Sequence, residues 1–256
     1  MPGPATDHGV TDHPATAPSA VPTLVVTGTD TGIGKTGVTA AILRTLAAAG
    51  ESVGALKMAC SGVGDEGRWD DVEQLLAALD ATDQPAVRDR VGPWCFDAPL
   101  APPQAARAEG RTLTPEDITA GRDRWGGRCD VLVAEGVGGL LCPLTDSTTV
   151  ADAIAAWDAV CIAVVGLRLG AINHALMTAE VAASRRLRLA GWVMNELTPP
   201  TDPDAAALTA AAAAEIARRS GVAVLAVRRF GEDRLRPPSG RGTIDAAAVR
   251  KWLGSA

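Results

Sequence analysis

The sequence predicts an α/β protein with three layers, in which a mostly parallel central sheet carries helices on both faces. From residue 23 onward, short apolar runs rich in β-branched residues alternate with alanine-rich segments. This alternation is typical of buried parallel strands joined by helices. The chain has 256 residues and no convincing internal repeat, which favours a single domain. The predicted strands are residues 23–27, 53–57, 131–135, 160–165, 190–194 and 222–227.

The domain is predicted to span residues 22–256. Residues 1–21 are rich in Pro, Ala, Thr, Asp and His, and this composition predicts a disordered N-terminal tail. The start of the chain has neither a basic region nor an apolar core, so we expect no signal peptide.

The overall composition narrows the class of partner. The formal net charge is −6, which argues against general nucleic-acid binding because that requires clustered cations. No apolar run approaches the roughly 18 residues that span a bilayer, so we expect no membrane partner. The 5 cysteines are scattered and never spaced as Cys-x-x-Cys. This pattern indicates neither disulfides nor zinc, and it favours a cytoplasmic location.

Most segments between the strands have helical composition. Gly50 is a plausible left-handed end for the first helix. Residues 92–103 include four prolines, and we predict that this region is largely irregular. The predicted helices are residues 35–49, 70–79, 104–109, 115–125, 169–187 and 244–253, with a further alanine-rich helix beyond residue 203.

A glycine-rich loop, residues 28–36 (GTDTGIGKT), joins the first strand to the first helix. Such a loop turns backbone N–H groups inward at a helix start, where they can hold phosphate oxygens. Lys35 is predicted to reach the β- and γ-phosphates, and the Thr36 hydroxyl to bind Mg²⁺. The usual pattern has four residues between its first glycine and Gly-Lys-Thr, whereas five separate Gly28 from Gly34. The bland alternative is an ordinary strand-to-helix turn with a surface lysine.

Polar residues end three of the predicted strands, where ligands bind in open α/β sheets. Lys57 is either a site residue or a solubilising surface charge. Glu135 follows a wholly apolar strand, and a carboxylate there is costly unless it is paired or binds a cation. The alternative is a glutamate facing solvent. Asn195 could read a base edge or hydrogen-bond the following turn.

Other polar residues are more ambiguous. Asp70 and Asp71 begin a helix, where an aspartate is as often a cap as a ligand. His174 has no obvious nucleophile or carboxylate partner, so a structural role is favoured. A solvated face is the favoured interpretation for the basic residues Arg228, Arg229, Arg234 and Arg236.

Taken together, these blocks resemble the dethiobiotin synthetase family. The phosphate loop with its five-residue gap is the family's own form, and the likeness spans about residues 24–200. The resemblance implies a P-loop NTPase-like fold. The matching blocks are residues 28–36, 57–62, 135–139, 169–174 and 191–199.

The resemblance also implies an activity, namely an ATP-dependent cyclo-ligase of biotin biosynthesis. In this family, 7,8-diaminononanoate takes up CO₂ as a carbamate, which attacks the γ-phosphate of ATP. The second amine then displaces phosphate and closes the ureido ring, giving dethiobiotin, ADP and phosphate. Such chemistry relies on positioning and on neutralising phosphate charge rather than on a nucleophile–base pair.

Roles for individual residues follow from the same resemblance. Lys35, Lys57 and Thr31 surround the transferred phosphoryl group and the carbamate. The nucleotide is bound by Gly32, Ile33, Gly34, Lys35, Thr36, Gly37 and the adenine-reading Asn195. The Mg²⁺ ligands are Thr36, Asp71 and Glu135, with Asp71 preferred to the adjacent Asp70. The substrate is bound by Ser61, Gly138 and Gly139 and, across a homodimer interface, by Gly170, Ala171 and Asn173 of a second subunit.

The chain departs from the family pattern in three places. Residues 57–59 read Lys-Met-Ala instead of Lys-Pro-Val, and residues 101–103 read Ala-Pro-Pro instead of Ala-Pro-His. Residues 226–229 replace a Gly-x-x-Pro segment that flanks adenine in the family, which leaves the nucleotide preference open.

Two other classes of protein fit less well. A partitioning ATPase would carry a second lysine inside the loop, where this chain has Asp30, Thr31 and Gly32. A corrinoid amidoligase would bring a glutaminase domain, for which the chain has no room.

Overall fold

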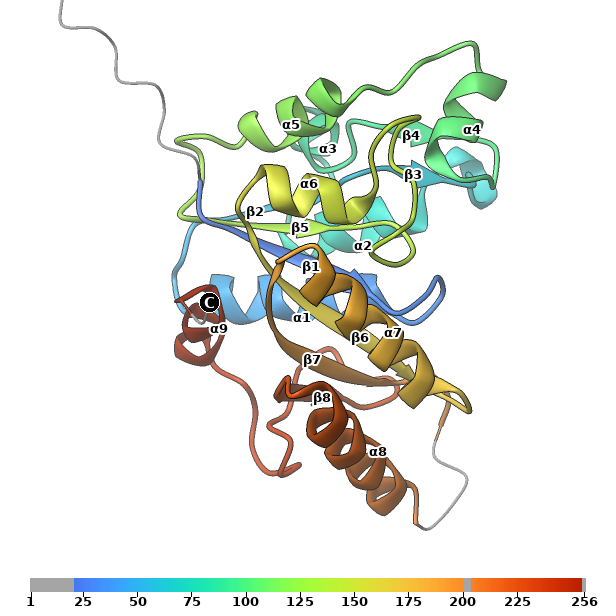
Figure 1. Cartoon of the computed structure of the whole chain (residues 1–256). Helices are drawn as coiled ribbons and strands as arrows, with labels where there is room; N and C mark the ends of the chain where they lie inside the picture. The colour runs from blue at the N-terminus through green and yellow to red at the C-terminus, as the bar shows by residue number, and fades with distance from the viewer. Residues whose placement is uncertain (1–20, 200–203, 255–256) are drawn as a thin grey trace, which may run out of the picture.

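The central sheet of the computed structural model, which describes residues 21–199 and 204–254, has six strands. Their order is β2-β5-β1-β6-β7-β8, and every neighbouring pair is parallel. Each predicted strand is confirmed within two residues (Figure 1). The bounds are β1 Thr23–Gly28, β2 Val53–Lys57, β5 Val131–Glu135, β6 Val160–Leu167, β7 Arg188–Glu196 and β8 Val224–Arg228.

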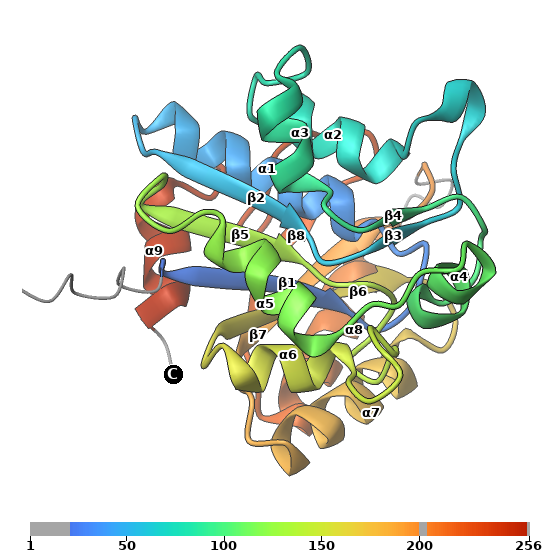
Figure 2. The ribbon, with the colours of Figure 1, turned by 90° about the horizontal axis from the view of Figure 1, so that it is seen from above.

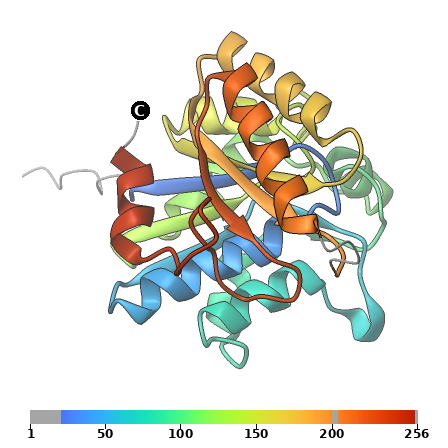
Figure 3. The same cartoon turned by 90° about the horizontal axis from the view of Figure 1, so that it is seen from below.

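Helices cover both faces of this sheet, as predicted (Figures 2 and 3). Most residues of these strands are apolar, and alternate residues of a strand point to opposite sides, so both faces of the sheet are apolar. Trp192 and Met194 of β7 pack with one cluster of buried residues, whereas Val193 packs with the other. On one face lie α1 Lys35–Ala48, α2 Asp70–Ala78, α3 Pro85–Val91 and α9 Ala246–Gly254. On the other lie α5 Pro115–Asp123, α6 Val150–Ala156, α7 Ala171–Ser184 and α8 Ala205–Ser220.

The strand order places the phosphate loop beside Glu135. Strand β1 lies between β5 and β6, and Val26 pairs with Glu135. On the far side of β5, Lys57 pairs with Glu135. Because all these strands are parallel, their carboxyl ends share one edge, and a crevice forms there where successive connections diverge.

Residues 92–103 are more regular than predicted. Strand β4 Cys95–Phe96 pairs in parallel with β3 Cys60–Ser61 as a separate small sheet, and η1 Asp65–Gly67 follows β3. Helix α4 Pro102–Ala108 begins on two prolines, which the first turn tolerates because its N–H groups have no partner within the helix. The prediction of a largely irregular segment therefore holds for residues 92–94 and 97–101 and fails for residues 95–96 and 102–103.

The described residues begin one residue before the predicted start of the domain. Residues 1–20 of the predicted tail lie outside the described residues, whereas Val21 is buried. Within the described part of the chain, no helix has the length and apolar character needed to cross a membrane.

Candidate active site

The phosphate loop has a conformation that depends on glycine. Gly34 precedes α1 at φ +81°, a left-handed value that side chains disfavour. A Cβ atom at Gly34 would lie 2.2 Å from Nδ2 of Asn195. That same Nδ2 donates a hydrogen bond to the Ile33 carbonyl at 2.8 Å, and the Ile33 side chain is buried. The loop is thus fixed both by the core and by the end of β7.

Lys35 is a buried cation that forms no ion pair with a carboxylate of the described residues. Its Nζ donates to the Asp30 carbonyl oxygen at 2.8 Å, so the side chain folds back over the loop. Burial, and next the charge of Lys57, lower the pKa of Lys35 to about 8, although Glu135 and Asp71 act in the opposite direction. A phosphate group at the loop would compensate this ammonium.

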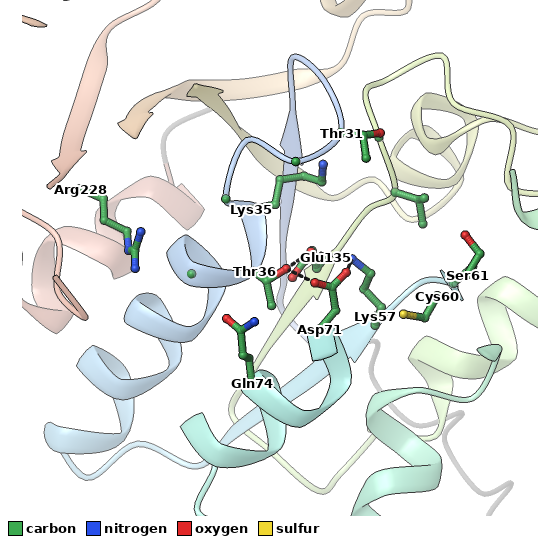
Figure 4. Close-up of a pocket in the computed structure, with 16 residues that line it drawn as sticks. Thr31, Lys35, Thr36, Lys57, Cys60, Ser61, Asp71, Gln74, Glu135 and Arg228 are labelled. Carbon is green, nitrogen blue, oxygen red and sulfur yellow. Dashed lines mark hydrogen bonds and ion pairs between the residues drawn. The ribbon is translucent and has the colours of Figure 1, made fainter. Parts of the chain in front are cut away.

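Lys57, Asp71 and Glu135 form a charge cluster with Thr36 (Figure 4). Lys57 Nζ lies 2.5 Å from Asp71 Oδ2 and 2.6 Å from Glu135 Oε1. Burial alone would lower the pKa of Lys57, but the charges of Glu135 and Asp71 outweigh it and raise that pKa. Burial acts to raise the pKa of Asp71, but the Lys57 charge and hydrogen bonds from Lys57 and Thr36 lower it overall.

The Thr36 hydroxyl contacts both carboxylates. Its Oγ1 lies 2.7 Å from Asp71 Oδ1 and 2.9 Å from Glu135 Oε1. A hydroxyl has only one proton to donate, so it satisfies one of these two acceptors at a time. Among the described residues, the buried Oε2 of Glu135 has no hydrogen-bond partner at all. The cluster is therefore rich in oxygen acceptors.

These oxygens fit a hard divalent cation. Mg²⁺ prefers carboxylate and hydroxyl oxygens and keeps waters and substrate phosphates as its other ligands. The described residues contain no group of three or more His, Cys, Asp or Glu side chains placed to hold a metal. A cation that also binds waters and substrate phosphates needs fewer ligands from the protein. Two carboxylates and a threonine beside a phosphate loop supply such a set.

One pocket, with a volume of about 410 Å³, joins these groups. At one end it reaches β3 and at the other it reaches Arg228, with the phosphate loop between (Figure 4). Of the predicted site residues it is lined by Thr31, Gly32, Gly34, Lys35, Thr36, Gly37, Lys57, Ser61, Asp71, Glu135 and Gly138. Asp71 contacts Thr36, whereas the adjacent Asp70 is exposed.

The remaining predicted residues lie outside this pocket. Ile33 and Asn195 are buried beneath the loop. Gly139 lines a neighbouring cavity with Thr31 and His174. Residues Gly170 and Ala171 line a separate pocket at the start of α7, and Asn173 donates to the Met177 sulfur there. None of these three residues lines the main pocket.

Sequence reasoning missed five residues that line this pocket, namely Ala59, Cys60, Gln74, Val137 and Arg228. Arg228 ends β8 and is half-buried, so a solvated face was the wrong interpretation for it. The sequence does contain a signal for Arg228, because this residue directly follows a predicted strand. Lys57, Glu135 and Asn195 likewise lie at the ends of predicted strands. Gln74 lies three residues after Asp71, which places both on one side of a helix.

Comparison with known proteins is consistent with this geometry. Residues 22–227 match the AAA domain family AAA_26. The chain is 40% identical over 174 residues to the ATP-dependent dethiobiotin synthetase BioD of Nitrosospira multiformis, covering 68% of this chain and 75% of that protein. It is 43% identical over 173 residues to the protein of the same name from Ralstonia nicotianae, covering 66% and 74%.

Solved structures include a more distant match. The cell division protein FtsY of Thermotoga maritima aligns with 91% of this chain and 68% of its own, at 16% identity and a TM-score of 0.44. This structural similarity is too weak to support an assignment, so the family is assigned from the relatives found by sequence. The chain belongs to the dethiobiotin synthetase family.

Proposed function

We propose that the protein catalyses the ATP-dependent carboxylation and ring closure of 7,8-diaminononanoate with CO₂, giving dethiobiotin, ADP and phosphate. Family membership supports the reaction class, a carbon–nitrogen ligase of biotin biosynthesis. The observation that carries the proposal is the pocket that joins the phosphate loop to the Lys57–Asp71–Glu135 cluster and to Ser61.

The proposed mechanism rests mainly on charge and position. A carbamate oxygen of the substrate attacks the γ-phosphorus of ATP, and ADP leaves. Lys35 and Lys57 hold positive charge around the phosphoryl group in transit, and the Thr31 hydroxyl and loop N–H groups donate to its oxygens. The second amine then attacks the carbamoyl carbon, and phosphate leaves as the ring closes. In this proposal Ser61, which lines the same pocket, binds the diamine end of the substrate.

Thr36, Asp71 and Glu135 would hold Mg²⁺ in this proposal. When bound there, the cation neutralises phosphate charge and draws the nucleotide and the carboxylates together. The unpartnered Oε2 of Glu135 supports this assignment because a buried carboxylate oxygen is costly without a donor or a cation.

We also propose a homodimer in which Gly170, Ala171 and Asn173 of one subunit bind the carboxylate tail of substrate held by the other. Two features support it. The start of α7 lies outside the pocket that contains Lys35, and apolar side chains nearby are exposed, with Leu169 fully so and Met177 58% exposed. The proposed location is the cytoplasm, with small molecules rather than nucleic acid or membrane as partners.

The test is a labelling assay. The pure protein is incubated with 7,8-diaminononanoate, labelled bicarbonate, Mg²⁺ and ATP, and acid-stable label is measured in dethiobiotin. We expect label incorporation in step with ADP release, and loss of both in Lys35→Ala and Glu135→Ala with the circular dichroism spectrum unchanged. ATP turnover that ignores the diamine and leaves no label would refute the proposal.

A further inference from the structure

Arg228 differs from its neighbouring arginines in having no carboxylate partner among the residues that the structure describes. Arg229 lies 3.6 Å from Glu196, and Arg234 and Arg236 lie 3.9 Å and 2.7 Å from Glu232. Arg228 instead donates from Nη1 to the Asn195 side-chain oxygen at 3.2 Å. Its Nε is buried and has no partner within the described chain.

The guanidinium lies directly over the first turn of α1. A Cβ atom at Gly37 would be 2.9 Å from Arg228 Cζ, so the guanidinium packs closely against the glycine. Arg228 also lines the main pocket together with Gly37. In Figure 4, Arg228 and Ser61 lie at opposite ends of the labelled residues, with Lys35 and Thr36 between them.

This placement sets the direction of the nucleotide, a step that rests on the proposed function. Lys35 and Thr36 hold the β- and γ-phosphates in a phosphate loop, and the N–H groups of the loop and first helical turn hold the α- and β-phosphates. The γ-phosphate is transferred toward the Lys57 and Ser61 end. The α-phosphate and the nucleoside must therefore lie toward Gly37 and Arg228.

We propose that Arg228 binds the α-phosphate of the nucleotide, as an addition to the phosphate loop. A half-buried cation without a counter-charge is better compensated by an anion than by a neutral base. The planar guanidinium fork also matches phosphate oxygens. Burial, and next the charge of Arg44, lower the pKa of Arg228, which indicates how poorly the free protein compensates it.

The same residue connects the nucleotide to the shape of the loop. Arg228 holds the Asn195 oxygen, and the Asn195 nitrogen holds the Ile33 carbonyl within the loop. An α-phosphate bound to Arg228 would thus stabilise the segment that binds the other two phosphates.

The test compares Arg228→Gln, which keeps a donor for Asn195 but removes the charge, with Arg228→Lys, which keeps the charge. Arg234→Gln is the matched control because Arg234 is exposed and belongs to the same segment. Calorimetry measures the Kd of three probes: ADP, a non-hydrolysable ATP analogue, and inorganic tripolyphosphate. Thermal unfolding of each variant shows whether it is folded.

We expect Arg228→Gln to weaken all three probes about 10-fold or more, Arg228→Lys to weaken them less, and Arg234→Gln to bind as the wild type does. Unchanged ADP affinity in folded Arg228→Gln would overturn the proposal. So would a loss for ADP with none for tripolyphosphate, because it would indicate contact with the base or ribose. Binding needs no diamine, so this result stands apart from any failure to form dethiobiotin.

Discussion

At the scale of single residues, the site depends on a cation held between two carboxylates. Lys57 is 4% exposed and Glu135 1% exposed as side chains, so neither charge is compensated by water. We predict that Lys57→Met lowers the free energy of unfolding by about 3 kcal/mol, because it leaves the buried carboxylate of Glu135 without its cation. Arg107→Met breaks an exposed ion pair with Asp146 and should cost less than about 1 kcal/mol.

Urea unfolding measures both variants. The double variant Lys57→Met/Glu135→Gln should recover much of the lost stability, because it removes both charges of the buried pair. A double variant no more stable than Lys57→Met would contradict the assignment of the cost to the unpaired Glu135.

A second prediction concerns protons taken up on nucleotide binding. With a pKa of about 8, Lys35 is partly neutral in the free protein at pH 8. Bound phosphates favour its charged form, so ADP binding at this pH should take up about half a proton, and ADP affinity should fall between pH 7 and pH 9. Calorimetry in buffers of different ionisation enthalpy measures the uptake. Lys35→Met should remove it, and uptake that persists in this variant would assign it to another group.

The sequence identified most residues of the pocket because they occupy two predictable places, the phosphate loop and the ends of parallel strands. Apart from the family resemblance, which favoured Asp71, it could not decide between Asp70 and Asp71, because adjacent helical residues differ by about 100° in direction. Only packing against α1 shows that Asp71 meets Thr36. The contacts of Asn195 were equally beyond reach, since Ile33 is 162 residues distant in sequence.

At the scale of elements, the strand-to-helix connection is the critical part. We predict that Gly34→Ala abolishes measurable ADP binding and lowers stability by about 1–3 kcal/mol, since it combines a left-handed φ with a clash against Asn195. Gly50→Ala is a control with nearly the same φ, +83°, and nothing within 4 Å of the added Cβ. It should cost roughly 1 kcal/mol and leave ADP binding intact.

Calorimetry of ADP binding and urea unfolding separate the two effects. Equal losses of binding in both variants would mean that strain alone, rather than the contact with Asn195, disables the loop.

The main strands and α1 were predictable because their apolar runs must be buried whatever surrounds them. Strands β3 and β4 were not, because each spans two residues and forms only through the pairing of Cys60 with Cys95 and of Ser61 with Phe96. Local composition in that region, with its prolines, favours irregular structure. Long-range pairing, which no local pattern records, decided the outcome.

At the scale of the whole molecule, the question is whether one chain makes a complete site. The start of α7 is tied to the loop by an ion pair between Arg168 and Asp30, yet Gly170 and Ala171 open into a different pocket. Leu141, Leu169 and Met177 are exposed apolar side chains, and Leu141 and Met177 line the cavity that also contains Thr31 and His174. Exposed apolar surface can mark an interaction site, and a second copy of the chain is the proposed occupant.

Complementation between two impaired variants, Asn173→Asp and Lys35→Ala, tests this arrangement. Asn173→Asp adds a negative charge where the substrate carboxylate is proposed to bind, and the exposed helix start tolerates it. We expect this variant to raise the KM for the diamine about 10-fold while the KM for ATP stays unchanged. Lys35→Ala should be inactive alone.

In an equal mixture of exchanging dimers, half are hybrids, and in each hybrid one site receives intact Lys35 from one subunit and intact Asn173 from the other. Assayed at low diamine, the mixture should recover about a quarter of the wild-type rate, well above the sum of the separate variants. If each chain instead supplied its own Asn173, every site with an intact Lys35 would carry the negative charge that the Asn173→Asp substitution introduces. The rate would then stay at half that of Asn173→Asp alone, and the shared site would be refuted.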